Sequence, residues 1–194
     1  MSFLTDSNRT SPNFSTKIQA LEARSQDLSI SPKKQGDASR SAEALERVHA
    51  AYQKTGLGKL DLVPLPASRP KLDIQGVTIS LTLGCQVRGQ FKGNPAVGAL
   101  TVLFNKSEAS ASARDERART AAALSLIYAT EHLGGHGKAV AKLCLAYDVF
   151  RGTVTTCPSQ IARRIANMEA TCEEVALRWP AVKVPDDYDG PPIV

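Results

Sequence analysis

The sequence predicts an α+β fold: an antiparallel β-hairpin within a small sheet, packed against three to four helices and preceded by a disordered N-terminal arm. Residues 77–87 alternate apolar and polar side chains over the length of a long strand, and several later segments repeat apolar residues at helical spacing. Hydrophobic residues make up 42% and charged residues 22% of the 194-residue chain, which is typical of a globular protein with a sizeable core.

Residues 1–37 form a polar, serine-rich arm that contains Ser11-Pro12, Ser31-Pro32 and Gly36. This composition buries too little apolar surface to offset the entropy lost on ordering, so the arm is predicted to be mobile. A short helix over residues 16–28 would be marginal on its own.

Residues 38–70 are predicted to form a helix followed by a proline-rich connector. Apolar side chains recur at intervals of three and four over residues 38–54, before Gly56 and Gly58. Prolines then alternate with apolar residues from Leu62 to Pro70, which excludes a helix. The connector is expected to lie over the domain surface, and docking of a protein partner on Leu62–Pro70 is the alternative.

The strand over residues 77–87 is the central element of the predicted sheet, with one buried face and one solvated face. Residues 97–104 are expected to form the second strand of a hairpin whose long tip spans Arg88–Pro95. Because two strands alone are marginal, a third is expected from residues 71–74, from residues 152–156 or from another copy of the chain.

Three helices are predicted to complete a compact domain over residues 71–180: residues 112–129, 138–150 and 158–179. The last of them has Pro158 in its first turn. Residues 181–194 form an acidic, proline-rich tail, which is a second candidate for docking a protein partner.

The hairpin tip is the first candidate binding site. It places Arg88 and Lys92 on either side of Phe91. Cationic side chains interleaved with an aromatic ring combine phosphate attraction with a stacking platform, which single-stranded nucleic acid binding uses. Packing of Phe91 back onto the sheet is the alternative.

Two basic pairs are further candidates for contact with an anionic partner. Lys33 and Lys34 follow Ser31-Pro32, a short basic motif that suits a DNA minor groove or a phosphorylation site, although a solvated turn is the simpler interpretation. Arg163 and Arg164 lie near the start of a helix, where the helix dipole disfavours cations. A placement that costs stability suggests that this pair faces an anionic partner.

No set of residues identifies a catalytic or metal site. Cys157 precedes a helix, but no local pattern pairs it with His132 or His136, and Gly134-Gly135 interrupts the helix that a histidine pair would need. The four cysteines lack a C-x-x-C pair and read as reduced, buried thiols. We therefore predict no cofactor, no metal and no enzymatic activity; a small enzyme using a Cys/His pair is the third alternative.

The net positive charge of the chain favours an anionic partner. The net charge is +5, with +3 in residues 1–70, +4 in residues 71–152 and −2 in residues 153–194. The predicted function is a non-enzymatic structural or accessory protein that binds nucleic acid, RNA in the first place, or an anionic membrane surface, and that self-associates as viral coat or matrix proteins do. A protein-interaction or effector module with a regulatory N-terminus is the alternative. No secretory signal or membrane span is seen, so an intracellular location, cytoplasmic or nuclear, is expected.

Overall fold

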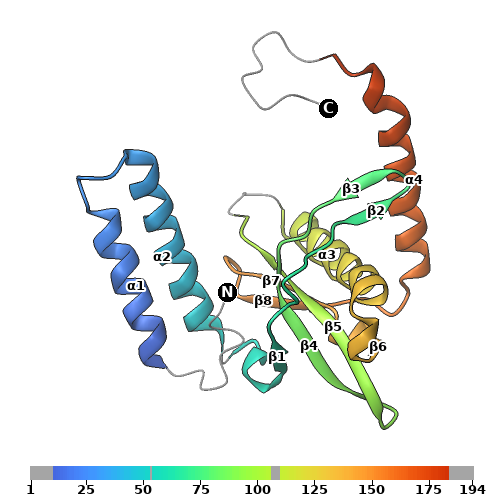
Figure 1. Ribbon diagram of the computed structural model, residues 1–194, viewed down its shortest axis with the longest axis horizontal. Helices are drawn as coiled ribbons and strands as arrows, with labels where there is room; N and C mark the ends of the chain where they lie inside the picture. Colours follow the sequence, from blue (N-terminus) through green and yellow to red (C-terminus); the bar gives the residue numbers. More distant parts are fainter. Residues whose placement is uncertain (1–10, 53, 106–109, 184–194) are drawn as a thin grey trace.

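The computed structural model describes residues 11–52, 54–105 and 110–183 (Figure 1). The α-helices are α1 (Ser11–Ser25), α2 (Pro32–Tyr52), α3 (Ala111–His132) and α4 (Ala162–Arg178). The strands are β1 (Asp61–Val63), β2 (Leu72–Ile74), β3 (Val77–Ile79), β4 (Leu83–Phe91), β5 (Asn94–Leu103), β6 (Lys138–Ala139), β7 (Leu145–Asp148) and β8 (Thr153–Thr156). Single 3₁₀ turns are η2 (Leu57–Lys59), η3 (Gly134–His136), η4 (Ala141–Leu143) and η5 (Trp179–Ala181). The described chain is thus a mixed α+β protein, as predicted.

The main sheet has six strands, in the order β1-β4-β5-β7-β8, with β6 beside the first part of β5. Neighbouring strands run antiparallel, except that β5 is parallel to both β6 and β7. The short strands β2 and β3 form a separate antiparallel pair. Both segments expected to supply a third strand, residues 71–74 and 152–156, contain one, although only β8 joins the main sheet.

Helices pack on both faces of the main sheet, so the protein has two apolar clusters. On one face α3 lies over β5 and β7, and its buried alanines meet Val97, Ala99 and Ala146. On the other face α1 and α2 contribute apolar side chains that contact strand residues. Those helical residues are Phe14, Val48 and Tyr52. In Figure 1 the α1–α2 pair stands to the left of the body and α4 to the right.

The predicted single strand over residues 77–87 is two strands. Residues 77–79 pair with β2, and β4 begins only at Leu83, where a register shift between Leu83 and Cys85 interrupts the ladder with β5. This irregularity reverses the alternation, because Leu83 packs on the α3 side whereas Cys85 and Val87 pack on the α1–α2 side. The alternating pattern is real, but its two halves serve different clusters.

The prediction of a helix over residues 138–150 is wrong. This segment forms β6, the single turn η4 and the strand β7. Strand β7 lies between β5 and β8 and is buried on both faces, so Leu145, Ala146 and Tyr147 are all apolar and fully or almost fully buried. A strand buried on both faces loses its two-residue alternation, and its apolar run then resembles the pattern of a helix.

The arm predicted to be mobile also differs from the structure where residues are described. Residues 11–37 form α1 and the first turns of α2, and residues 1–10 lie outside the described residues. Phe14 is 1% exposed and its ring stacks on His49 at a centroid distance of 4.9 Å. Two helices that pack on each other and place one aromatic ring in the core recover the ordering entropy that neither would recover alone.

Candidate nucleic-acid interface

The β4–β5 hairpin ends in a tight turn and not in the long tip that the sequence suggested. The ladder continues to Phe91 and Asn94, so only Lys92 and Gly93 lie in the turn. Their φ angles, 53° and 78°, are both positive, as a type I′ turn requires. The ribbon is therefore paired up to its tip, and it projects from the body at the bottom of Figure 1.

A second lysine joins the hairpin because Gly137 lets the chain pass close to β5. A Cβ atom at Gly137 would lie 2.8 Å from the Pro95 carbonyl carbon and oxygen, and φ at this glycine is 137°. The chain can therefore continue as β6, in which Lys138 pairs with Ala96. Since Ala96 pairs in turn with Gly89 of β4, Lys138 flanks the distal half of the hairpin.

A third lysine arrives on η4, which lies directly on β5. A Cβ atom at Gly98 would lie 2.1 Å from the carbonyl oxygen of Leu143, so only glycine allows this contact. The Leu143 side chain also covers Gly89, where a Cβ atom would lie 3.3 Å away. Lys142, the exposed residue before Leu143, is thereby placed beside the hairpin.

We call this group of one aromatic and four cationic residues the hairpin patch: Arg88, Phe91, Lys92, Lys138 and Lys142. Phe91 is 36% exposed, and the Lys92 Nζ lies 5.7 Å from its ring centroid. In the described part of the chain, none of the four cations forms an ion pair with a carboxylate.

Arg88 has the most contacts in the patch. Its Nη2 lies 3.4 Å from the His136 Nδ1, and Asp61 is its register partner on β1. The Nε of Arg88 is buried without a hydrogen-bond partner among the described residues. Arg88 is therefore positioned at the foot of the patch, with its guanidinium only partly satisfied by a histidine.

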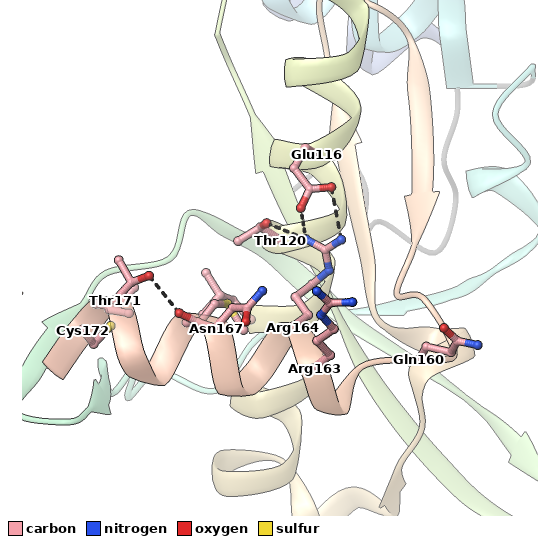
Figure 2. A pocket seen from close by; sticks show the side chains of 11 residues that line it. Glu116, Thr120, Gln160, Arg163, Arg164, Asn167, Thr171 and Cys172 are labelled. Atoms are coloured by element: carbon pink, nitrogen blue, oxygen red, sulfur yellow. Dashed lines mark hydrogen bonds and ion pairs between the residues drawn. The ribbon is translucent and has the colours of Figure 1, made fainter. Parts of the chain in front are cut away.

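The other predicted arginines lie elsewhere, beside a groove of about 580 Å³ between α3 and α4. Figure 2 shows Arg164 pointing toward α3, where its Nη1 and Nη2 bond the carboxylate of Glu116. The Nη1 also donates to the Thr120 Oγ1 at 3.1 Å. The anionic partner of Arg164 is thus a carboxylate of its own chain, while Arg163 is exposed at the groove and forms no ion pair with a described residue.

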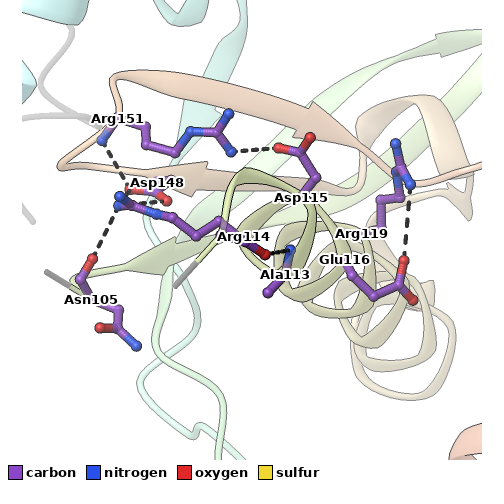
Figure 3. Close-up of polar contacts among 9 residues, drawn as sticks. Asn105, Ala113, Arg114, Asp115, Glu116, Arg119, Asp148 and Arg151 are labelled. Atoms are coloured by element: carbon purple, nitrogen blue, oxygen red, sulfur yellow. Dashed lines mark hydrogen bonds and ion pairs between the residues drawn. The ribbon is translucent and has the colours of Figure 1, made fainter. Parts of the chain in front are cut away.

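Further arginines near the start of α3 are paired with carboxylates (Figure 3). Arg114 donates to both carboxylate oxygens of Asp148, at 3.3 and 3.2 Å, and to the Asn105 carbonyl oxygen at 3.2 Å. Arg151 bonds Asp115, and this hydrogen bond holds the pKa of Asp115 below its usual value. These pairs join α3 to β7 and to the β7–β8 turn.

Lys33 and Lys34 lie in the first turn of α2 and are exposed. In Figure 1 this turn is at the top of the α1–α2 pair, far from the projecting end of the β4–β5 hairpin and from α4. The structure therefore places the predicted site residues in three separate regions: the hairpin, the groove between α3 and α4, and the first turn of α2. Only at the hairpin do further cations, Lys138 and Lys142, join the predicted residues.

Among the residues considered for catalysis, Cys157 is buried, whereas His136 is exposed. Burial raises the pKa of the Cys157 thiol, and it raises the pKa of Cys144 to about 12. The Cys157 Sγ donates to the Pro158 carbonyl oxygen at 3.7 Å, whereas His136 contacts Arg88. In the described ranges, no three His, Cys, Asp or Glu side chains gather as a metal site would need.

Sequence reasoning missed two members of the hairpin patch, Lys138 and Lys142, because it assigned both to a helix. The available signal was Gly137 together with Gly98. Glycine inside an apolar strand run marks close approach of another backbone, and it is this approach that brings β6 and η4 to the hairpin.

Comparison with protein-family models, with curated proteins and with solved structures finds no match to this chain. Of the helices in the described ranges, none is both long enough and apolar enough to cross a lipid bilayer.

Proposed function

We propose that this protein is a non-catalytic structural or accessory protein that binds single-stranded RNA through the hairpin patch. One observation carries the proposal: in the described part of the chain, four cations without a carboxylate partner lie on or beside a projecting, fully paired ribbon, whose exposed Phe91 ring has Lys92 next to it. The proposed setting is intracellular, in an assembly of several copies, as in viral coat or matrix proteins.

The charge arrangement supports a polyanionic ligand. Cations that lack internal partners keep their field and attract phosphates, and each phosphate that they neutralise releases counterions from the nucleic acid. With four cations in the patch, the logarithm of the binding constant is expected to fall with the logarithm of salt concentration with a slope of about −3 on a single strand. Most of the affinity should be independent of base sequence.

The exposed ring supports a single strand over a duplex. Unpaired bases can stack on Phe91, whereas the bases of an A-form duplex are already stacked on each other and are not available to it. Because the turn fixes the ring beside Lys92, one base and its phosphate can contact the two residues together.

Fluorescence anisotropy with a labelled oligouridylate, measured over a series of salt concentrations, tests the proposal. The double variant Lys92→Gln/Lys138→Gln should weaken binding about tenfold at low salt and reduce the size of the salt slope by about 1.4. The matched control is Lys33→Gln/Lys34→Gln, which removes the same charge from the first turn of α2 and should bind as the unchanged protein does.

Two results would overturn the proposal. One is an affinity that depends on Lys33 and Lys34 but not on the hairpin lysines. The other is retention of the protein on anionic phosphatidylserine vesicles, abolished by the hairpin variant, with no binding of RNA at low salt. The second result would assign the patch to a membrane surface.

A protein-interaction module is the second candidate, and the end of α4 favours it. Val175, Leu177 and Trp179 are 41%, 75% and 53% exposed there. The connector gives less support, because Leu62 and Leu65 are buried and so hold it against the body. The acidic segment 184–194 lies outside the described residues. If this candidate is correct, Leu177→Ser/Trp179→Ser should abolish capture of a protein partner and leave RNA affinity unchanged.

A further inference from the structure

The two outer edges of the main sheet differ in how they are protected. The edge strand β1 starts with the charged Asp61 and is followed by Pro64 and Pro66, which cannot donate to a further strand. The opposite edge strand, β8, reads Thr-Val-Thr-Thr; it carries no charge, and the next proline, Pro158, comes two residues after its end, whereas Pro64 directly follows β1. Natural edge strands usually carry such devices, so β8 is the edge that remains open to pairing.

The hydrogen-bond alternation shows which groups of β8 point outward. The Cys157 N–H donates to the Cys144 carbonyl oxygen at 2.8 Å, which is one bond of a hydrogen-bonded pair and shows that this N–H faces β7; the Cys144 N–H donates instead to the Ala141 carbonyl oxygen at 3.1 Å. Such pairs alternate in an antiparallel ladder, so Thr155 and Thr153 also face β7. The N–H and C=O groups of Val154 and Thr156 therefore point away from the sheet, and no described residue bonds them.

We propose that β8 pairs antiparallel with β8 of a second copy, about a two-fold axis that passes between the two Thr155 residues. In this register Val154 of each copy lies opposite Thr156 of the other. All four outward N–H groups of the pair then find carbonyl partners, and the two main sheets join into one continuous sheet.

The occupant of this edge is argued from its symmetry. An isologous interface needs a surface that complements itself. Strand β8 meets this condition in the register described, because the outward-facing residues Val154 and Thr156 lie on either side of the central Thr155. Thr155 meets Thr155 and Val154 meets Thr156, which are favourable cross-strand pairs without like charges. Exposure of Thr153 and Thr156 at the two ends of the strand leaves this edge accessible.

Pairing through β8 does not rest on RNA binding. In the sheet order β8 is separated from β4 by β5 and β7, so the dimer would leave both hairpin patches free. A dimer would also present two patches to one strand of RNA, which would raise the effective concentration of the second site. An experiment can therefore contradict dimerisation through β8 without contradicting RNA binding by the hairpin patch, and the reverse also holds.

Sedimentation of the full chain between about 1 and 100 µM tests the pairing. The unchanged protein should dimerise, and Thr156→Pro, which removes one outward N–H from each copy, should weaken the dimer about tenfold to a hundredfold. Proline is tolerated at an outward-facing edge position, so the variant keeps its ladder with β7. The matched control is Thr156→Val, which keeps the N–H and the branched side chain and should dimerise normally.

Disulfide cross-linking is a second test of β8 pairing that does not depend on the proline variant. Thr155→Cys should form a disulfide between copies in the presence of oxidised glutathione, because opposed residues have their Cβ atoms about 5 Å apart. The four native cysteines are buried, and Thr78→Cys, exposed on β3, is the control position. A protein that stays monomeric, a dimer unaffected by Thr156→Pro, or equal cross-linking at both positions would overturn the proposal.

Discussion

Two regions of this protein are rich in basic side chains, but they use them differently. Around the start of α3, Arg114, Arg151 and Arg164 each bond a carboxylate that belongs to another element of the chain. In the hairpin patch, by contrast, the four cations have no carboxylate partner among the described residues. The first region holds elements together, whereas the three lysines of the second are exposed to the solvent.

This difference shows that the partners of a cation, and not its presence, indicate what it does. A guanidinium bonded to a carboxylate has a field that is largely cancelled within a few ångströms, so it attracts phosphates weakly. An unpaired lysine on a projecting ribbon keeps its field. Substitutions in the first region should therefore reduce stability and leave RNA binding intact, and those in the second should do the reverse.

The largest expected effect is on stability, at Arg114. Asp148 is nearly buried, with 8% of its side chain exposed, and Arg114 is its ion-pair partner. Arg114→Ala would leave this carboxylate without its guanidinium, so the free energy of unfolding in urea should fall by about 2 to 3 kcal/mol. Affinity for oligouridylate should not change while the variant is folded.

Arg117→Ala is the matched control for this substitution. Arg117 lies on the same helix, is exposed, and forms no ion pair with a described residue, so its loss should change stability by less than about 0.5 kcal/mol. Equal losses of stability in the two variants would contradict the structural role given to the Arg114–Asp148 pair.

The next effect concerns Phe91 and sharpens the second half of the comparison. Removing the ring by Phe91→Ala should weaken binding of single-stranded RNA about fivefold, the equivalent of about 1 kcal/mol for one stacked base. Stability should be nearly unchanged, because the ring is partly exposed at the hairpin tip. Phe91→Trp is the matched control and should retain or improve the affinity. An equal loss with duplex RNA would show that the ring does not stack on bases.

Much of the fold follows from local patterns in the sequence. The helices α3 and α4 and the strands β2, β5 and β8 lie within or close to the segments predicted for them. The apolar residues of α4 fall on one face, so a helical period describes it, whereas β5 is buried on both faces and was recognised from the turn residues that precede it. The pattern failed where a segment contributes to two apolar clusters, as residues 77–87 do, or is buried on both sides, as β7 is. Burial of this kind depends on contacts distant in the sequence.

The candidate site was predictable only in its contiguous part. Arg88, Phe91 and Lys92 lie within five residues and can be recognised together. Lys138 and Lys142 join them through backbone contacts at Gly137 and Gly98, which no short motif encodes. Arg164 shows the opposite error: its position near a helix start suggested an external anion, whereas the fold supplies Glu116.

The smallest effect is the acid sensitivity of the paired region. Arg164 holds the pKa of Glu116 below its usual value of 4.5, and Arg151 holds the pKa of Asp115 below 3.8, in both cases chiefly by a hydrogen bond. A carboxyl whose pKa is lower in the folded state stabilises the fold above its unfolded pKa. That contribution to stability is lost as the pH falls through the pKa that the carboxyl has in the folded state.

The double variant Arg151→Gln/Arg164→Gln removes both causes, so it should unfold at a lower urea concentration than the unchanged protein at pH 6. The difference should shrink as the pH is lowered toward 3, because the unchanged protein then loses the contribution that the variant lacks. Both carboxylates are partly exposed, which keeps the effect modest and sensitive to salt. Two curves of urea midpoint against pH that run parallel from pH 6 to pH 3 would show that these arginines do not stabilise the fold through their carboxylates. The contrast between paired arginines at α3 and unpaired cations at the hairpin would then lose its energetic basis.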